Sequence, residues 1–215
     1  MVAIPTHSVP PRTPPPLILA SASPRRRDLL AQLAIPFRII PANIDERVLP
    51  EESPCDYPRR VALAKARHIA QQFPAAVVLG ADSVVVLERQ ILGKPRDAAE
   101  ARRMLTHLSG RQHAVLTGLA VLHQERQLAY CDLVKTLVRF HVLSREMIER
   151  YVATGEPLDK AGAYAIQGAA APFVASREGC YTNVVGLPLR RTAALLQLAG
   201  LSVPTGPEHS AQTAW

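Results

Sequence analysis

The sequence predicts an α/β or α+β fold with a mixed central sheet flanked by helices. Short apolar runs rich in β-branched residues, of which residues 77–87 are the most apolar, are typical of buried strands. Segments with apolar residues at helical spacing, such as residues 56–73, lie between these runs. Residues 113–123 and 128–143 look like two long strands joined by a polar turn. Such a mixture of elements is typical of a mixed sheet.

The length of 215 residues suits one domain, or two small lobes around one cleft. Apolar residues make up 48% of the chain, which is enough for a hydrophobic core. Residues 1–16 hold six prolines and are predicted to form a flexible leader. Residues 204–215 are predicted to form a flexible tail, which leaves residues 17–203 as a single domain.

The first elements follow from local patterns. The apolar run at residues 17–20 predicts a buried strand, and residues 37–40 predict a second one. Between them, Ser23 is a good helix N-cap and Pro24 suits the first helical position. We therefore expect a helix that begins at Pro24 and runs through Leu33.

The later helices are predicted from residues that typically begin or end a helix. Residues 97–108 predict a helix opened by an acidic side chain. Ser144 is expected to cap a helix that runs through Tyr151. A final apolar helix is expected from about residue 191 to residue 199, where Gly200 ends it.

The composition narrows the classes of partner. A net charge of +7 favours nucleic acid, nucleotides or acidic membranes, without choosing among them. Three cysteines, Cys55, Cys131 and Cys180, have no CxxC spacing, which argues against a disulfide framework or a zinc ribbon. No apolar run approaches the roughly 18 residues of a membrane span, and the N-terminus is too rich in proline for a signal-peptide core. We expect a cytoplasmic protein that does not enter membranes.

The segment from Ser21 to Arg26 is a candidate anion site. It lies where a strand meets a helix start, and free backbone N–H groups and the helix dipole favour an anion there. Ser21 and Ser23 add hydroxyl donors, while Arg25 and Arg26 offer guanidinium groups that bind phosphate oxygens in pairs. An ordinary N-cap followed by a solvated basic turn explains the same residues.

Asp82 is the candidate catalytic carboxylate. A lone carboxylate in such an apolar strand is costly to bury unless it has a metal, a cation or several donors. At the mouth of a cleft it could bind a metal or activate water. The alternative is a strand-end aspartate that caps a turn.

Three further charged residues are weaker candidates alone. Glu46 lies in a loop beside a second acid, and such pairs are usually solvated. Lys65 lies at the edge of an apolar helix face, where a surface lysine would also fit. Lys94 lies in a tight Leu-Gly-Lys-Pro turn that is not a Walker loop.

Gln167 is a candidate for contact with a base. It lies in a glycine-punctuated stretch, residues 155–168, of the kind that often carries function. Its amide offers both a donor and an acceptor, which suits a nucleobase edge. A glutamine that faces water in an ordinary loop is the alternative.

Taken in order, these pieces resemble the Maf family of nucleotide pyrophosphatases over roughly residues 17–198. Each short motif is modest, whereas the ordered set is highly specific. The motifs are SASPRR at 21–26, LGADSVV at 79–85, LGKPRD at 92–97, LSGRQH at 108–113, TGEPLDKAGAYAIQG at 154–168 and NVVGLPL at 183–189.

The resemblance implies two lobes around a deep cleft, as in Maf and ITPase-like proteins. It implies hydrolysis of a nucleoside triphosphate to a monophosphate and pyrophosphate with a divalent metal, Mg²⁺ or Mn²⁺. Asp82 matches the proposed proton acceptor, and Glu46, Lys65 and Lys94 are expected to be catalytic with it. We further expect Asp82 and Glu46 to hold the metal. The other matching site residues are Ser21, Ser23, Arg25, Arg26, Lys65, Ser83, Lys94 and Gln167, of which Arg25, Ser83 and Gln167 are linked to substrate choice.

The stretch DKAGAYAIQG is similar to the branch that acts on dTTP and UTP. Ser83 lies where that branch commonly has threonine, so a small change in selectivity is expected. A pyrophosphatase for 7-methyl-GTP or another modified nucleotide is the alternative within the family. A non-enzymatic nucleic-acid-binding domain is a distant alternative, because aromatic residues are scarce at 5%. We therefore expect a nucleotide substrate, no stable nucleic-acid complex and, by analogy with the family, a possible homodimer.

Overall fold

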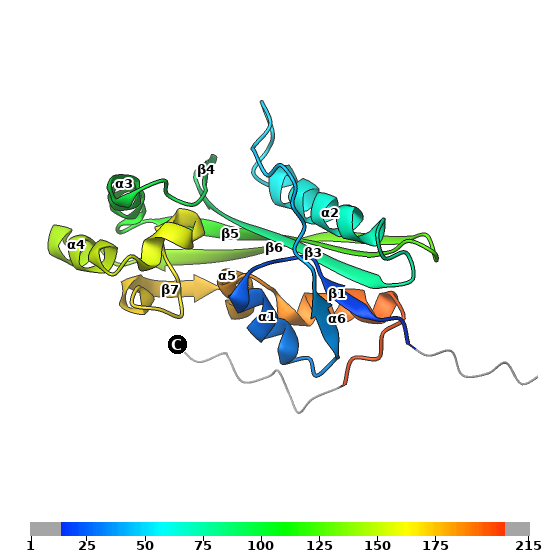
Figure 1. The fold of residues 1–215 in the computed structure, drawn as a ribbon. Coiled ribbons are helices and arrows are strands. Elements are labelled where there is room, and N and C mark those ends of the chain that lie inside the picture. The colour runs from blue at the N-terminus through cyan, green and yellow to red at the C-terminus, as the bar shows by residue number, and fades with distance from the viewer. Residues whose placement is uncertain (1–13, 205–215) are drawn as a thin grey trace, which may run out of the picture.

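The computed structural model describes residues 14–204, which are built around a seven-stranded mixed sheet (Figure 1). The predicted mixed α/β fold is confirmed. Most of the predicted leader and tail lies outside the described residues, so both stay predictions. The strands are β1 (Leu17–Leu19), β2 (Phe37–Ile39), β3 (Val77–Leu87), β4 (Gln90–Leu92), β5 (Gln112–His123), β6 (Leu128–Phe140) and β7 (Val174–Glu178).

Helices cover both faces of this sheet. The helix α2 lies on one face, whereas α1, α5 and α6 lie on the other, and α3 and α4 lie toward one end (Figure 1). The helices are α1 (Pro24–Ala31), α2 (Asp56–Ala70), α3 (Ala98–Leu108), α4 (Arg145–Ala153), α5 (Tyr181–Val185) and α6 (Leu189–Leu198). Short 3₁₀ turns follow α4, namely η1 (Glu156–Asp159), η2 (Ala161–Ala163) and η3 (Ala171–Phe173). No helix of residues 14–204 is long and apolar enough to cross a membrane.

The lengths of neighbouring strands create an opening in the sheet. The strands run in the order β2-β1-β3-β5-β6-β7, with β4 also paired to β3. β1 is parallel to β2 and β3, and the other pairs are antiparallel. β1 has three residues whereas β3 has eleven. On this edge β1 pairs with residues 77–79 of β3 and β4 pairs with residues 85–87, so the stretch between them faces an opening at the carboxyl end of β1.

Two glycines let α2 pack directly against the sheet. A Cβ at Gly118 would lie 2.1 Å from the carbonyl oxygen of Pro58, and one at Gly80 would lie 2.2 Å from that of Ala62. Both contacts are with helix backbone, so no larger side chain fits at this spacing. The close approach fixes the height of α2, and hence of Lys65, above β3.

The buried residues form two lobes, as the family resemblance implies. One lobe packs α1 and α6 on one face and α2 on the other, around β1 and the first half of β3. The second lobe joins the end of β3 to α3, α4 and the 3₁₀ turns. Its centre is a set of edge-to-face aromatic contacts among His113, Phe140, Tyr151, Tyr164 and Phe173.

Several boundaries differ from the predictions. The first helix ends at Ala31, α2 ends at Ala70 and β6 ends at Phe140, each earlier than expected. α6 begins at Leu189, because Pro188 takes the N-cap position that the sequence left unmarked. The short elements β4, β7 and α5 were not predicted. Each has five residues or fewer, which is too short for a period in the sequence to show.

Candidate functional site

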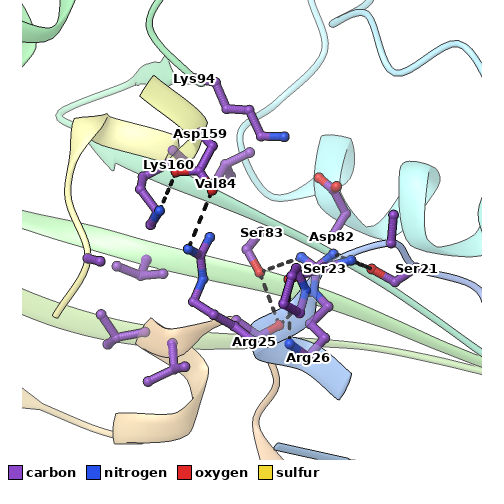
Figure 2. Close-up of a pocket in the computed structure, with 18 of the residues that line it drawn as sticks. Ser21, Ser23, Arg25, Arg26, Asp82, Ser83, Val84, Lys94, Asp159 and Lys160 are labelled. Atoms are coloured by element: carbon purple, nitrogen blue, oxygen red, sulfur yellow. Dashed lines mark hydrogen bonds and ion pairs between the residues drawn. The ribbon is translucent and has the colours of Figure 1, made fainter. Parts of the chain in front are cut away.

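A cavity of about 350 Å³ occupies the opening at the carboxyl end of β1, between the two lobes. Ligands commonly bind outside the carboxyl ends of parallel strands in open α/β sheets. Every predicted site residue lines this cavity, and Figure 2 shows most of them. These residues are Ser21, Ser23, Arg25, Arg26, Glu46, Lys65, Asp82, Ser83, Lys94 and Gln167.

The turn from Ser21 to Arg26 forms one wall of the cavity. Ser23 has extended backbone angles and its Oγ accepts a hydrogen bond from the Arg26 backbone N–H at 3.4 Å, as expected of an N-cap. Pro24 occupies the first helical turn. The positive end of α1 therefore lies on the cavity, where it favours an anion.

The two arginines of this turn lie in different surroundings. Arg26 is partly buried and donates to the Gly186 carbonyl at 2.9 Å, to Ser83 Oγ at 3.0 Å and to Ser21 Oγ at 3.3 Å. Burial lowers its pKa, although the nearby carboxylates of Asp82 and Glu46 oppose this shift. A guanidinium has five N–H donors, so three are used inside the protein and two are left for a ligand. Arg25 instead extends toward Asp159, 3.9 Å away (Figure 2).

Asp82 and Ser83 reach the cavity from opposite faces of β3, because adjacent strand residues alternate. Asp82 faces α2, where its Oδ1 accepts a hydrogen bond from Lys65 Nζ at 2.9 Å. The same Nζ lies 2.9 Å from Glu46 Oε2, so Lys65 joins the two acids. Ser83 faces α1. Its hydroxyl lies 2.8 Å from that of Thr117 and also accepts the hydrogen bond from Arg26.

Burial has the largest effect on the pKa of the Asp82 carboxylate. Only 7% of Asp82 is exposed, and burial raises its pKa above the usual aspartate range, while Lys65 and then Arg26 oppose the shift. Lys65 is also 7% exposed, so the pair is largely shielded from water. A carboxylate of this kind can accept a proton and still be held in one orientation by its lysine partner.

The acid pair also fits a particular kind of metal site. Among residues 14–204 no group of three or more His, Cys, Asp and Glu side chains could hold a metal ion. Mg²⁺ is usually bound by one or two carboxylates together with phosphates and water rather than by a protein cage. Asp82 and Glu46 suit that mode, since both line the cavity and are held on one lysine.

The remaining predicted residues lie on the second lobe's side of the cavity. Lys94 extends into it from the side opposite Arg26 (Figure 2). Gln167 is exposed and lines the cavity from the turn at residues 165–168. Cations and an amide thus surround the space from both lobes.

Three polar side chains that line this cavity were not predicted from the sequence, namely Asp159, Lys160 and Tyr164. Lys160 is ion-paired with Asp159, which also faces Arg25. Tyr164 is buried, and its hydroxyl lies 2.8 Å from His113 Nε2. All three belong to the glycine-punctuated stretch from which only Gln167 was chosen. The opposite charges at 159 and 160 were the available signal.

Comparisons with known proteins agree on one family. The model of a family described as Maf-like protein matches residues 16–199. A dTTP/UTP pyrophosphatase of Symbiobacterium thermophilum is 52% identical over 190 residues, which cover 88% of this chain and 97% of that protein. A dTTP/UTP pyrophosphatase of Anaeromyxobacter dehalogenans is 54% identical over 192 residues, with the same shares covered.

A solved structure is similar in fold. It is described as a HAM1 protein from Coxiella burnetii, and it matches with a TM-score of 0.50 and 17% identity. The match covers 85% of this chain and 98% of that structure. At this identity the likeness concerns the arrangement of the elements alone.

Proposed function

The chain belongs to the Maf family, and we propose that it hydrolyses dTTP and UTP to the nucleoside monophosphate and pyrophosphate. The names of its relatives support this activity over 7-methyl-GTP hydrolysis and over non-enzymatic binding of nucleic acid. One arrangement of residues is the main reason to assign this activity to the cavity. A shielded carboxylate, Asp82, held by Lys65, faces the positive end of α1 across a space of about 350 Å³.

The cations around the cavity would bind the triphosphate. The start of α1 and Arg25 would bind phosphate oxygens from one wall, while Lys94 and Lys160 would approach from the other. Arg26 would act through its two remaining N–H groups and by fixing Ser21 and Ser83 in place. Several donors held in advance stabilise charge that develops in the transition state.

Asp82 would accept the proton of the attacking water. The water oxygen bonds to the α-phosphorus, the bond from that phosphorus to the pyrophosphate oxygen breaks, and pyrophosphate leaves. The raised pKa of Asp82 brings its basicity closer to neutral pH, which favours proton transfer. Lys65 occupies Oδ1, which leaves Oδ2 for the water.

Glu46, together with Asp82 through the same Oδ2, would also hold a divalent metal ion, Mg²⁺ or Mn²⁺, so the proton-accepting and metal-binding roles of Asp82 compete for one oxygen. Such an ion would neutralise phosphate charge when bound. Lys65 would keep both carboxylates turned toward the cavity, since its Nζ lies 2.9 Å from each.

Gln167 and Ser83 would set the choice of substrate. The amide of Gln167 can donate to and accept from a pyrimidine edge. Ser83 has one methyl fewer than threonine and lies against Thr117 and Arg26, so it leaves slightly more room at that point.

Three further expectations belong to the same proposal. We expect a cytoplasmic enzyme, because the three cysteines carry free thiols and the cytosol keeps thiols reduced. We expect no stable complex with nucleic acid or membrane. A homodimer remains an expectation by analogy with the family.

A substrate panel tests the activity. Pyrophosphate release would be measured with dTTP, UTP, CTP, GTP and 7-methyl-GTP, with and without Mg²⁺. We expect dTTP and UTP to have the highest kcat/KM and release to stop when the metal is chelated. A preference for 7-methyl-GTP would assign the chain to the 7-methyl-GTP branch of the family. No release of pyrophosphate from any triphosphate would refute the proposal.

A further inference from the structure

We propose that Tyr151 and Glu156 are positioning residues that aim Gln167, and thereby set the selectivity of the enzyme for its base. This inference rests on the proposed function, because it concerns how the same cavity recognises the base of its substrate. Neither residue lines the cavity. Their effect would pass through the backbone of the turn that carries Gln167.

Gln167 lies in a closed turn. The Gly168 backbone N–H donates to the Ala165 carbonyl at 3.1 Å, which closes the turn around Ile166 and Gln167. Ile166 is partly buried and packs against both main core clusters, whereas Gln167 is exposed. An exposed side chain can hold a fixed direction only if its backbone is fixed.

Two hydrogen bonds hold this turn at both ends. The Ala165 N–H donates to the Tyr151 hydroxyl at 3.3 Å, and the Ala169 N–H donates to Glu156 Oε2 at 3.2 Å. The Tyr151 hydroxyl donates in turn to Glu156 Oε1 at 3.1 Å, so the two anchors are joined. We call these two side chains the Tyr151–Glu156 clamp.

The clamp is rigid because Tyr151 is buried. Only 3% of this residue is exposed, and its ring packs edge to face on Phe173 with centroids 5.2 Å apart. The carboxylate of Glu156 fits against Gly168, where a Cβ would lie 1.9 Å from Oε1. The glycine at 168 therefore leaves the space that the carboxylate needs.

Three substitutions break the clamp in different ways. Tyr151→Phe keeps the ring and removes the hydroxyl, while Glu156→Gln exchanges one acceptor oxygen for a donor. Gly168→Ala keeps Tyr151 and Glu156 themselves unchanged but pushes the Glu156 carboxylate away from the turn, and the backbone of Gly168 is not in the left-handed region. The matched control is Tyr130→Phe, which removes a tyrosine hydroxyl that donates to the Leu198 carbonyl at 3.3 Å, far from the turn in sequence.

The test measures kcat/KM for UTP and for CTP and takes their ratio. The wild type should favour UTP, and each clamp variant should lower the ratio by about threefold to tenfold, the value of one hydrogen bond. Tyr130→Phe should leave the ratio at the wild-type value. Thermal unfolding of each variant identifies any loss that comes from misfolding.

A double-mutant cycle separates positioning from general damage. Gln167→Ala should lower the ratio, and adding Tyr151→Phe to it should lower the ratio no further, because the hydroxyl acts only through Gln167. Equal effects of Tyr151→Phe with and without Gln167 would overturn the proposal, as would an unchanged ratio in all three clamp variants. Failure of the wild type to release pyrophosphate would instead refute the proposed function.

Discussion

At the scale of the residue, two buried titratable side chains show how their surroundings decide their chemistry. Asp82 is buried on the wall of the cavity, and its cationic partners Lys65 and Arg26 partly oppose the rise of its pKa. His113 is buried among aromatic rings, with its ring centroid 4.9 Å from that of Phe140 and no partner for Nδ1. Burial lowers the pKa of His113 to about 4. One group is suited to accept a proton, and the other stays neutral.

The shift of His113 predicts a pH dependence of stability. The unfolded chain binds a proton near pH 6.5, whereas the folded protein does so only near pH 4. The contribution of His113 to stability is therefore fully present above pH 6.5 and is lost between pH 6.5 and 4, by up to about 3 kcal/mol in total. His113→Gln should flatten the free energy of unfolding over this range when it is measured by urea titration.

Comparing the wild type with His113→Gln isolates the titration of His113, since Asp82 and the other acids titrate in both proteins. At pH 8 histidine is neutral in both states, so a difference there reports the change in packing and in the hydrogen bond to Tyr164, not a change in charge. A variant whose stability falls with pH as steeply as that of the wild type would contradict the assignment.

Single residues were predictable where they stand out from their surroundings or form a known local signal. Asp82 is a charge in an apolar strand, and Ser23-Pro24 is a helix-start signal, so both were evident in the sequence. The commitment of Arg26 to internal hydrogen bonds was not, because its partner Gly186 is 160 residues away. Tyr164 was missed for the same reason, since only packing brings it to the cavity.

At the scale of the element, the site depends on a short strand beside a long one. Because β1 ends at Leu19, the following residues turn into α1 while β3 continues past them. The turn and the extended strand thus face each other at the cavity. α2 completes the site by bringing Lys65 over β3.

Gly118→Ala tests this role of α2. The new Cβ would meet the Pro58 backbone at 2.1 Å, so the helix must move or the strand must bend. We expect a loss of about 3 kcal/mol in unfolding free energy and a lower kcat, because Lys65 moves with the helix. Thermal unfolding and pyrophosphate release measure the two effects.

The matched control is Gly93→Ala, at a glycine whose Cβ would meet nothing within 4 Å. Its unfolding free energy should change by less than about 1 kcal/mol. Equal stability of the two variants would contradict the close approach of α2 to the sheet.

The long elements were predictable, as were the short strands β1 and β2, whereas β4, β7 and α5 were not. The apolar run at residues 77–87 matches β3 in both bounds, and Ser144 caps α4 as expected. β4 has three residues and exists because β3 offers it an edge, which is a tertiary cause. Neither its existence nor that of β7 could follow from local pattern.

At the scale of the whole molecule, the two lobes bring together segments that lie far apart in the chain. The cavity collects residues from 20 to 186, and the ten predicted site residues all line it. Spacing in the sequence could not place the 159–167 stretch opposite α1. Only the resemblance to a family implied that these motifs meet.

The central claim is that Asp82 is the working carboxylate of this cavity. The most direct measurement is pyrophosphate release from dTTP and UTP by Asp82→Asn, which keeps the shape of the side chain and removes its charge. We predict a loss of about 10²–10⁴-fold in kcat, with a thermal unfolding transition that shows an intact fold. A folded Asp82→Asn enzyme that released pyrophosphate at a rate near that of the wild type would contradict the account.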